Sequence, residues 1–430
     1  MTDRQLAVYL DGTLCGHITQ TSGGNLSFAY DPEYRVSTGA TPLSLSMPLA
    51  AISHKKRAIL PFLQGLLPDS EDALRAISRR YSVSANSPFA LLEHVGADVA
   101  GAVQIMRPGE SASDRDRSRT KVRATSNDDV ATMLDHVVSE YSEGVPYYEA
   151  VGRFSLAGAQ PKIALHRLAD GTWGVPEDAT PTTHILKPVV GSFRRLDVVE
   201  QMTMHAAAHL GNEVATSAIA RFGEWDVFVS ERYDRTIVNG QWRRCHQEDF
   251  CQALSVSPAN KYQHRDGGPG LADIGRLIRS LPFESDRRMV GERFYRGFVF
   301  NIVAGATDAH AKNYSLMLDG AAVRLAPLYD LATYAAYWDG EARLDSAMKV
   351  GGEYALTRIG AGQLAGAGNQ FGVPADAAAD IVAGVRRGLL EAFESARAEI
   401  EVQGKGAREV ADALISAVRR LPLVITGKSE

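Results

Sequence analysis

The sequence predicts an α+β protein in which a small N-terminal unit precedes a larger, two-lobed domain. Three observations favour this fold class. Residues 6–30 alternate apolar and polar positions, strand-like segments return between 154 and 229, and the pattern from Tyr233 onward is mainly helical. With 430 residues, of which 45% are hydrophobic and 23% charged, the chain is long enough to form two or three hydrophobic cores.

Charge and cysteine content exclude several classes of protein. The chain has 46 Lys and Arg against 51 Asp and Glu, a net charge of -5, so any contact with DNA must be local or made through a partner. Cys15, Cys245 and Cys251 are too few for a disulfide framework or a four-ligand zinc site. The first residues do not resemble a signal peptide, and the longest apolar stretch, 297–306, is about half of what spans a bilayer. We therefore expect a cytoplasmic protein with no membrane segment.

The N-terminal unit is expected to open with a sheet. Residues 6–30 form three alternating segments, separated by Asp-Gly at 11–12 and by Ser-Gly-Gly-Asn at 22–25. Such turn residues between alternating segments are typical of antiparallel strands. A three-stranded meander is predicted.

Two helices are predicted after this sheet. Asp69 or Ser70 can cap a helix that runs through Tyr81. Ser87, followed directly by a proline at the first helical position, predicts a shorter helix that ends near Gly96. Together with the meander, these helices make a compact α+β unit.

A charged segment follows this unit. Residues 107–127 lack large apolar side chains and alternate in charge sign, which is typical of an exposed loop or linker. A nucleic-acid patch is less favoured there because the acidic residues cancel the local field. Ser126 and Asp129 form a capping-box pattern for a helix through Val138, and we place the domain boundary near Gly144.

The next segment is predicted to be a sheet with one helix. Strand signals occur in 154–175, interrupted by Asp-Gly at 170–171, and again in 183–187. An amphipathic helix is expected over 196–210, followed by strands that end near Val229.

The remainder of the chain is predicted to be helical, apart from a hairpin around Asp-Gly at 319–320. A strand-rich lobe followed by a helical lobe is the layout of a protein-kinase-like domain. The expected division is an N-terminal accessory domain at 1–144, a kinase N-lobe at 145–235 and a helical C-lobe at 236–430.

The strongest functional pattern lies around this hairpin. Asp308 and Asn313 are five residues apart in a loop after an apolar helix, which is the spacing of the protein-kinase catalytic loop. The hairpin should return Asp330 to the neighbourhood of Asn313, with His310 and Lys312 in the same region. Phosphoryl transfer needs a carboxylate that accepts the hydroxyl proton, and Asn plus a second carboxylate for Mg²⁺. The alternative is a polar loop whose side chains cap turns.

Two upstream features fit a nucleotide site. The small residues at 157–159 let backbone amides approach an anion, and Lys162 can add a charge, although a plain β-turn is the default interpretation. Lys187 ends an apolar strand and Glu200 lies on the next helix, so an ion pair between them would orient the lysine as in kinases. Both residues are otherwise ordinary surface charges.

At this point the sequence resembles a known family. Seven motifs occur in the order typical of HipA-type serine/threonine kinases: FSLAGAQPK, THILKP, SERYDR, HQEDFCQ, DGGPG, GATDAHAKN and APLYD. The N-terminal part is similar to the accessory domain of that family in GGNLSFAYDPEY, PLSLSMPL, GLLPDS and SPFALLEHVGADVAGAVQ. The resemblance covers nearly the whole chain.

The resemblance implies the toxin kinase of a type II, HipBA-like toxin–antitoxin system that uses ATP and Mg²⁺. Family members phosphorylate a translation component, most characteristically glutamyl-tRNA synthetase, and aminoacyl-tRNA synthetases are the expected targets here. Growth arrest and persistence follow from that reaction. The implied partner is a HipB-like helix-turn-helix antitoxin, which would make the main contact with operator DNA.

The resemblance also implies roles for individual residues. Asp308 would accept the proton, and Asn313 and Asp330 would bind Mg²⁺. Ser155 matches the serine that the family autophosphorylates to silence itself. The remaining implied nucleotide-binding residues are the phosphate loop Ala157, Gly158, Ala159, Gln160, Pro161 and Lys162, then Lys187, the adenine hinge Glu231, Arg232 and Tyr233, and His310, Ala311, Lys312 and Tyr329.

The sequence departs from the family motifs at two positions, and two competing functions stay open. Ala309 stands where many members have Gly, and Pro161 where many have Glu, but neither change removes a catalytic group. One competing function is a catalytically silent co-repressor that binds the antitoxin. The other is a kinase of small molecules or lipids on a related fold.

Overall fold

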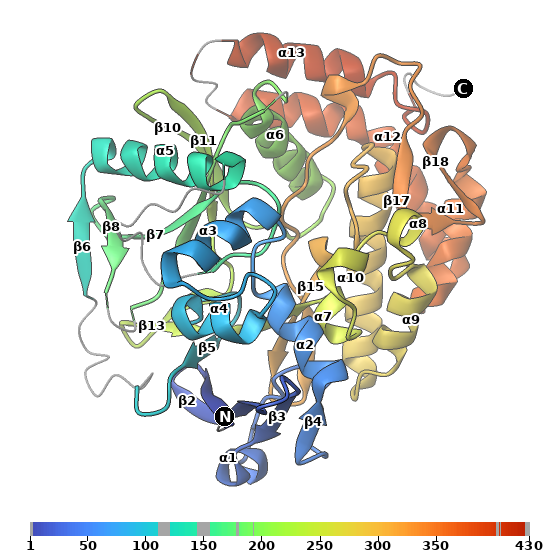
Figure 1. Cartoon of the computed structure of the whole chain (residues 1–430). Coiled ribbons are helices and arrows are strands. Elements are labelled where there is room, and N and C mark those ends of the chain that lie inside the picture. The colour runs from blue at the N-terminus through green and yellow to red at the C-terminus, as the bar shows by residue number, and fades with distance from the viewer. Residues whose placement is uncertain are drawn as a thin grey trace.

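A computed structural model describes residues 3–110, 121–143, 155–177, 180–191, 193–400, 404 and 406–425. The N-terminal unit contains a five-stranded antiparallel sheet in the order β4-β3-β2-β1-β5 (Figure 1). Its strands are β1 Arg4–Leu10, β2 Thr13–Gln20, β3 Leu26–Tyr30, β4 Ser53–Lys55 and β5 Val103–Met106. The predicted three-stranded meander is β1 to β3.

Four helices complete this unit: α1 Pro32–Val36, α2 Lys56–Gly65, α3 Glu71–Tyr81 and α4 Pro88–Val95. The hydroxyl of Ser70 accepts a hydrogen bond from the amide of Ala73 at 3.3 Å, and Ser87 caps α4 in the same way. These caps satisfy amides that have no partner within the helix. Both predicted helices are therefore present at the predicted positions.

The small lobe is a six-stranded sheet in the order β10-β11-β9-β7-β8-β6. Its elements are β6 Val122–Thr125, α5 Asn127–Glu143, β7 Ile163–Arg167, β8 Trp173–Pro176, β9 His184–Pro188, α6 Leu196–His209, β10 Ser217–Phe222 and β11 Trp225–Glu231. Figure 1 shows α5 lying across these strands with α3 beside it. Val130, Leu134 and Val137 of α5 are buried against the sheet, so this helix belongs to the small-lobe core.

The charged segment 107–127 is not only a loop, which corrects the prediction. Residues 122–125 form the edge strand β6, which pairs antiparallel with β8. The prediction missed this strand because it is only four residues long and its two central residues, Arg123 and Ala124, are exposed. The expected boundary at Gly144 lies outside the described residues. Because β6 and α5 both join the small lobe, we propose that the boundary precedes β6.

The large lobe is mainly helical, as predicted. Its helices are α7 Phe250–Ala253, α8 Gln263–Asp266, α9 Leu271–Arg279, α10 Glu284–Val303, α11 Ala361–Ala367, α12 Ala375–Glu399 and α13 Ala407–Val418. The predicted hairpin consists of β15 Ser315–Asp319 and β16 Ala322–Leu325.

The expectation of a single hairpin after Tyr233 is wrong. Three further strand pairings occur, which involve β12 Arg235–Val238, β13 Gln241–Arg244, β14 His246–Asp249, β17 Asp345–Val350 and β18 Glu353–Ala355. These strands are three to six residues long and lack a long alternating pattern. Pairing with β15 defines β14, and that partner is about 70 residues away in sequence.

A buried charge network attaches the N-terminal unit to the segment after β11. The carboxylate of Asp98 lies 2.9 Å from Arg235, 3.3 Å from Arg244 and 3.5 Å from Arg232. It also accepts hydrogen bonds from Thr182 at 2.7 and 3.0 Å. Burial alone would raise the pKa of Asp98, but the three guanidinium groups hold it well below its usual range. The N-terminal unit is thus held to both the small lobe and the large lobe.

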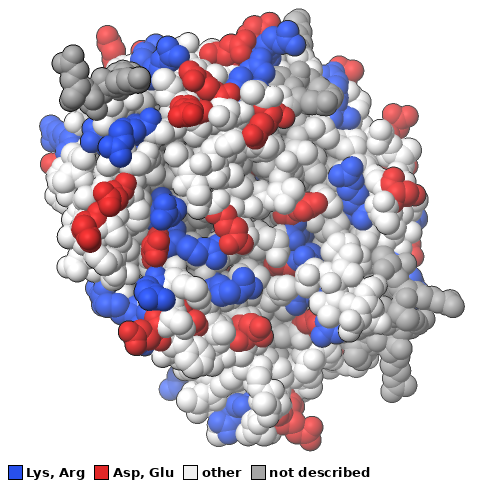
Figure 2. All heavy atoms as spheres, turned by 180° about the vertical axis from the view of Figure 1, so that it is seen from behind, with Lys and Arg blue, Asp and Glu red and all other residues white. Residues whose placement is uncertain are grey.

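The surface carries both charge signs. On the face in Figure 2, Lys and Arg side chains are interspersed with Asp and Glu side chains. This mixture agrees with the near balance of charges in the sequence. Among the residues that the structure describes, no helix combines the length and the apolar character needed to cross a membrane.

Candidate active site

A cavity of about 540 Å³ is lined by residues of the N-terminal unit and both lobes. The N-terminal unit contributes Gly65, Asp69 and Ala100 to its walls. Apolar side chains line much of the cavity, and several carboxylates and lysines converge within it. Concave sites with a few convergent polar groups are the usual place for small-ligand binding.

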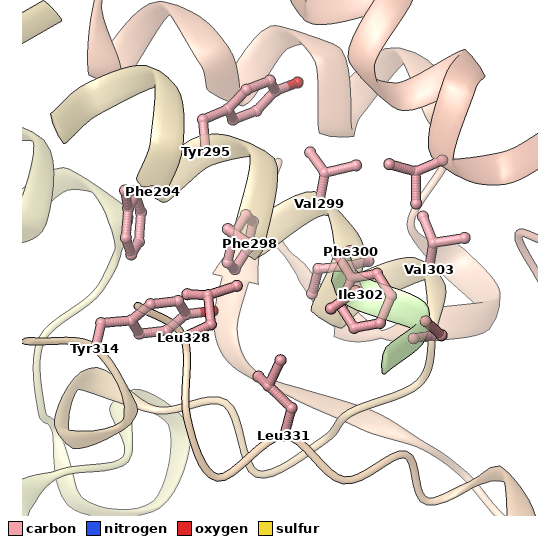
Figure 3. Close-up of a cluster of buried hydrophobic side chains, with 14 of the residues drawn as sticks. Phe294, Tyr295, Phe298, Val299, Phe300, Ile302, Val303, Tyr314, Leu328 and Leu331 are labelled. Carbon is pink, nitrogen blue, oxygen red and sulfur yellow. The ribbon is translucent and has the colours of Figure 1, made fainter. Parts of the chain in front are cut away.

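The catalytic-loop segment is anchored at both of its ends. Helix α10 is buried along most of its length, and Figure 3 shows Phe294 and Phe298 of this helix pointing toward Tyr314 and Leu328. The rings of Phe294 and Tyr314 are 4.8 Å apart, and the hydroxyl of Tyr314 accepts a hydrogen bond from Asn301 at 2.7 Å. Tyr314 follows Asn313 directly, so this packing fixes where Asn313 emerges.

Asp330 is also held in place by buried neighbours in the sequence. Its neighbours Leu328 and Leu331 are buried in the core cluster of Figure 3. The Asp330 carboxylate itself is 44% exposed and lines the cavity. Its φ is +58°, in the left-handed region that few residues other than Gly adopt. A strained backbone held by buried neighbours is often found where a side chain must point into a functional site.

Asp308 is the exposed carboxylate of the loop. The hydroxyl of Tyr262 donates a hydrogen bond to its Oδ1. Desolvation raises the pKa of Asp308, the Tyr262 hydrogen bond lowers it, and the charge of Asp330 raises it, with a net rise. A raised pKa makes the ionised carboxylate a stronger base and therefore a better proton acceptor.

Lys187 lies between two carboxylates. Its Nζ is 2.7 Å from Glu200 on α6 and 2.5 Å from Asp330, so the ion pair expected with Glu200 is present. Burial alone would lower the pKa of Lys187, but these two carboxylates raise it above its ordinary value. The lysine is therefore a fixed cation that faces the cavity.

The small-residue loop is folded against Lys162. The Nζ of Lys162 donates to the carbonyl of Ala157 at 2.9 Å. Gly158 has a φ of +112°, which strains any residue with a side chain, and a Cβ there would also displace that Nζ, which would lie 2.4 Å away. Burial, followed by the charge of Lys187, lowers the pKa of Lys162 to about 8. The protonation of Lys162 near neutral pH therefore depends on the charge of the group that occupies the cavity.

Two aromatic rings form part of the cavity wall beyond β11. Tyr233 and Tyr329 stack with ring centroids 5.6 Å apart. The hydroxyl of Tyr329 donates to the carbonyl of Lys312 at 2.8 Å, which ties this wall to the catalytic-loop segment. His310 also lines the cavity, and burial lowers its pKa to about 3, so its ring is neutral at physiological pH.

Comparisons with known proteins agree with this geometry. The HipA N-terminal domain family matches residues 6–106, and the HipA-like C-terminal domain family matches residues 154–393. The serine/threonine-protein kinase toxin HipA of Shewanella oneidensis is 31% identical over 77% of this chain and 76% of its own. The candidate kinase Y4mE of Sinorhizobium fredii is 35% identical over 84% of each chain. The chain belongs to the HipA family.

The fold is shared as well. A solved chain from the Shewanella oneidensis MR-1 complex of HipA, HipB and operator DNA has a TM-score of 0.79 at 24% identity, over 97% of each chain. This similarity confirms the predicted fold class, a two-lobed kinase-like domain behind an α+β accessory domain. The relatives in the HipA family confirm the prediction that the chain is a kinase.

The structure brings most of the predicted HipA site residues to one cavity. Those that line it are Ala157, Gly158, Ala159, Gln160, Lys162, Lys187, Glu231, Arg232, Tyr233, Asp308, His310, Lys312, Asn313, Tyr329 and Asp330. Pro161 and Ala311 are buried next to lining residues without lining the cavity themselves. Phe154, the first residue of the predicted loop motif, lies outside the described residues.

Two predicted residues have side chains directed away from the cavity. Ser155 is 2% exposed, and its hydroxyl donates to the carbonyl of Leu66 in the N-terminal unit at 2.8 Å. The guanidinium of Arg232 is turned toward Asp234 and Asp98 in the buried network. Any nucleotide contact of Arg232 would therefore come from its backbone.

The sequence analysis missed cavity residues from outside the kinase motifs. Asp69, which is expected to be a helix cap and belongs to the GLLPDS motif, lines the cavity, and so does Lys261. Tyr262, which contacts Asp308, was also missed. A tyrosine just upstream of the DGGPG motif was the available signal for Tyr262. The GLLPDS motif contains Asp69, but it does not indicate the contacts of this residue, because its partners are about 190 and 240 residues away.

The donor set at the cavity suits Mg²⁺. Asn313 and Asp330 offer an amide oxygen and a carboxylate, which are hard oxygen ligands. Among the described ranges, no group of three or more His, Cys, Asp or Glu side chains forms a metal cage. This pattern fits Mg²⁺, which is commonly held by one or two protein ligands together with substrate phosphates.

Proposed function

We propose that this chain is a HipA-type toxin that transfers phosphate from ATP, with Mg²⁺, to a serine or threonine of a protein. The observation that carries the proposal is the convergence of Asp308, Asn313, Asp330 and the Lys187–Glu200 pair on one cavity. These are the parts that a kinase needs to orient a nucleophile and neutralise the phosphates.

In this proposal the acceptor hydroxyl attacks the γ-phosphorus while the bond to the leaving ADP oxygen breaks. Asp308 accepts the hydroxyl proton, so its raised pKa suits the role. Asn313 and Asp330 would hold Mg²⁺, which neutralises charge on the phosphates. Lys187 would then contact the phosphates, with Glu200 keeping it in place.

The rest of the nucleotide would lie along the cavity wall. Residues 157–162 offer backbone amides and Lys162 to the phosphates, with Pro161 lacking an amide hydrogen. Backbone groups of 231–233 would bind adenine, and His310 would approach the ribose. Their shared location on the cavity supports these assignments.

The acceptor protein is proposed to be an aminoacyl-tRNA synthetase, and the family resemblance favours glutamyl-tRNA synthetase. Phosphorylation of such a target would stop translation and produce growth arrest and persistence. The test is to incubate the chain, Mg²⁺ and ATP with a panel of purified synthetases and to identify phosphopeptides by mass spectrometry. Absence of phosphate on every synthetase in the panel would refute this target class.

Ser155 is proposed to be the site of autophosphorylation that silences the kinase. Its hydroxyl is buried against Leu66, so the loop must leave the N-terminal unit before Ser155 can accept phosphate. A phosphate adds about two negative charges, which cannot return to that buried position. We expect the phosphorylated form to bind ATP poorly, and equal affinity in both forms would contradict the mechanism.

The first experiment compares the wild-type chain with Asp308→Asn after incubation with Mg²⁺ and ATP. Phosphopeptide mapping should find phosphate on Ser155 in the wild type and not in the variant. Asp319→Asn, a change at an exposed carboxylate in the nearby hairpin, is the matched control and should keep activity. Wild-type phosphotransfer by Asp308→Asn would show that the proton-acceptor assignment is wrong.

We further propose a HipB-like helix-turn-helix antitoxin as the partner, with operator DNA bound mainly through it. The net charge of -5 and the mixed surface support an indirect contact with DNA. A silent co-repressor is the second candidate function. ATP binding without phosphotransfer to any protein, together with tighter operator binding by the antitoxin, would favour it.

A further inference from the structure

The carboxylate of Asp69 joins the N-terminal unit to the catalytic-loop segment. Asp69 lies between α2 and α3, and its Oδ1 accepts a hydrogen bond from Lys312 at 2.6 Å. Its Oδ2 accepts one from Lys261 at 2.8 Å. The three side chains are 11%, 5% and 15% exposed in the order Asp69, Lys312, Lys261. This is a buried ion triplet rather than a pair of surface contacts.

The backbone of the same residue contacts the phosphate loop. The amide of Asp69 donates to the carbonyl of Gly158 at 3.1 Å, and Pro68 forms a parallel bridge with Gly158. Gly158 is the residue that packs against Lys162. One residue of the N-terminal unit thus contacts both loops that surround the proposed phosphate site.

Both lysines are next to residues that matter for the proposed reaction. Lys312 directly precedes Asn313, the proposed metal ligand. Lys261 directly precedes Tyr262, whose hydroxyl contacts Asp308. Moving either lysine would therefore displace a group that holds the metal or orients the proton acceptor.

The buried charges of Asp69 and its two lysine partners make the Asp69 carboxylate hard to replace. Burial would raise the pKa of Asp69, but Lys312 and Lys261 lower it below its usual range. Asp249 also faces Lys312, so Lys312 keeps one nearby carboxylate if Asp69 is lost. Removing the Asp69 charge leaves two buried ammonium groups that repel each other, and the loops must move apart to relieve the repulsion.

We propose that Asp69 is a positioning residue through which the N-terminal unit holds the catalytic loop and the phosphate loop in one productive arrangement. This inference rests on the proposed kinase function and deepens it. The N-terminal unit completes the active site, because its docking fixes Lys312 and Gly158 together. A partner that shifts this unit relative to the lobes would thereby change the rate of phosphotransfer.

The test separates ATP binding from turnover. In Asp69→Asn, we expect kcat for phosphotransfer to fall on the order of 10²-fold, since misplacement of catalytic groups by about 1 Å costs that much. The dissociation constant for ATP should not rise with the loss of turnover, because the Asp69 carboxylate repels phosphate and its removal leaves the charges of Lys312 and Lys261 free to attract it. Asp72→Asn, a change at a carboxylate that pairs with Arg75 on the helix surface, is the matched control and should leave both values unchanged.

A double-variant comparison tests whether Asp69 acts through Lys312. Lys312→Met should lower kcat by itself. The fold loss of kcat in the double variant with Asp69→Asn should be much smaller than the product of the fold losses in the two single variants. Independent, multiplicative effects would overturn the proposal, as would a wild-type kcat in Asp69→Asn. Thermal unfolding checks that each variant is folded, and if Asp69→Asn does not fold, the same kcat-against-ATP-affinity comparison is made with Lys312→Gln.

The outcomes also separate this inference from the proposed function. If the wild-type chain transfers no phosphate to itself or to any synthetase, the proposed function fails. If the wild type is active and Asp69→Asn is equally active, the kinase stands and only the role of Asp69 is refuted. Partial recovery of kcat in Asp69→Glu, which keeps the charge, would support positioning by the carboxylate.

Discussion

Raising the pH from 7 to 9 should weaken ATP binding about tenfold through loss of the proton on Lys162. Burial and the nearby Lys187 lower the pKa of Lys162 to about 8. The group is then about nine-tenths protonated at pH 7 and about one-tenth protonated at pH 9. Bound phosphates would favour the protonated form and raise this pKa again. Binding above pH 8 must therefore take up a proton, and affinity falls as the pH rises.

Titration of the Asp308→Asn variant with Mg²⁺ and ATP gives the dissociation constant without turnover, and it should be measured at half-unit steps of pH. Lys162→Arg is the matched control because a guanidinium stays charged over this whole range. Its affinity should be flat with pH, and that of Lys162→Met should be weak and flat. The reasoning is refuted if the Lys162 protein shows no pH dependence, or if Lys162→Arg shows the same tenfold fall.

Two further predictions concern stability and proton transfer. Asp98→Ala leaves three buried guanidinium groups without their shared carboxylate, and it should lower the free energy of unfolding in urea titrations by about 3–5 kcal/mol. The control Asp72→Ala should lower it by less than about 0.5 kcal/mol. A loss below about 1 kcal/mol in Asp98→Ala would contradict this prediction. Tyr262→Phe removes the hydrogen bond that lowers the pKa of Asp308, so that pKa should rise. The acidic limb of kcat/KM should then move to higher pH, and a shift to lower pH would refute the assignment.

Local signals explain which elements could be predicted from the sequence. The caps Ser70 and Ser87 act within three residues, so they mark the starts of α3 and α4 without reference to the rest of the fold. The spacing of Asp308 and Asn313 and the Asp-Gly turn that returns the chain toward Asp330 are equally local. Most of the candidate site could be predicted because its residues lie within a few local motifs.

The elements that the sequence did not reveal depend on distant partners. The strand β6 is four residues long with two exposed central residues, and its pairing with the distant strand β8 defines it. Asp69 reaches Lys312 across 243 positions of sequence, and nothing near either residue indicates the other. Ser155 belongs to the loop motif in the sequence, but its burial against Leu66 depends on how the N-terminal unit docks.

Docking of the N-terminal unit and occupation of the proposed nucleotide site must be linked thermodynamically. Arg232 contributes its backbone to the cavity wall and its side chain to the buried network around Asp98. Gly158 likewise faces the cavity on one side and contacts Asp69 on the other. If docking strengthens ATP binding by some factor, ATP must strengthen docking by the same factor, because the two equilibria share these residues. A partner that binds the docked and the undocked N-terminal unit with different affinities would therefore change ATP affinity without entering the cavity.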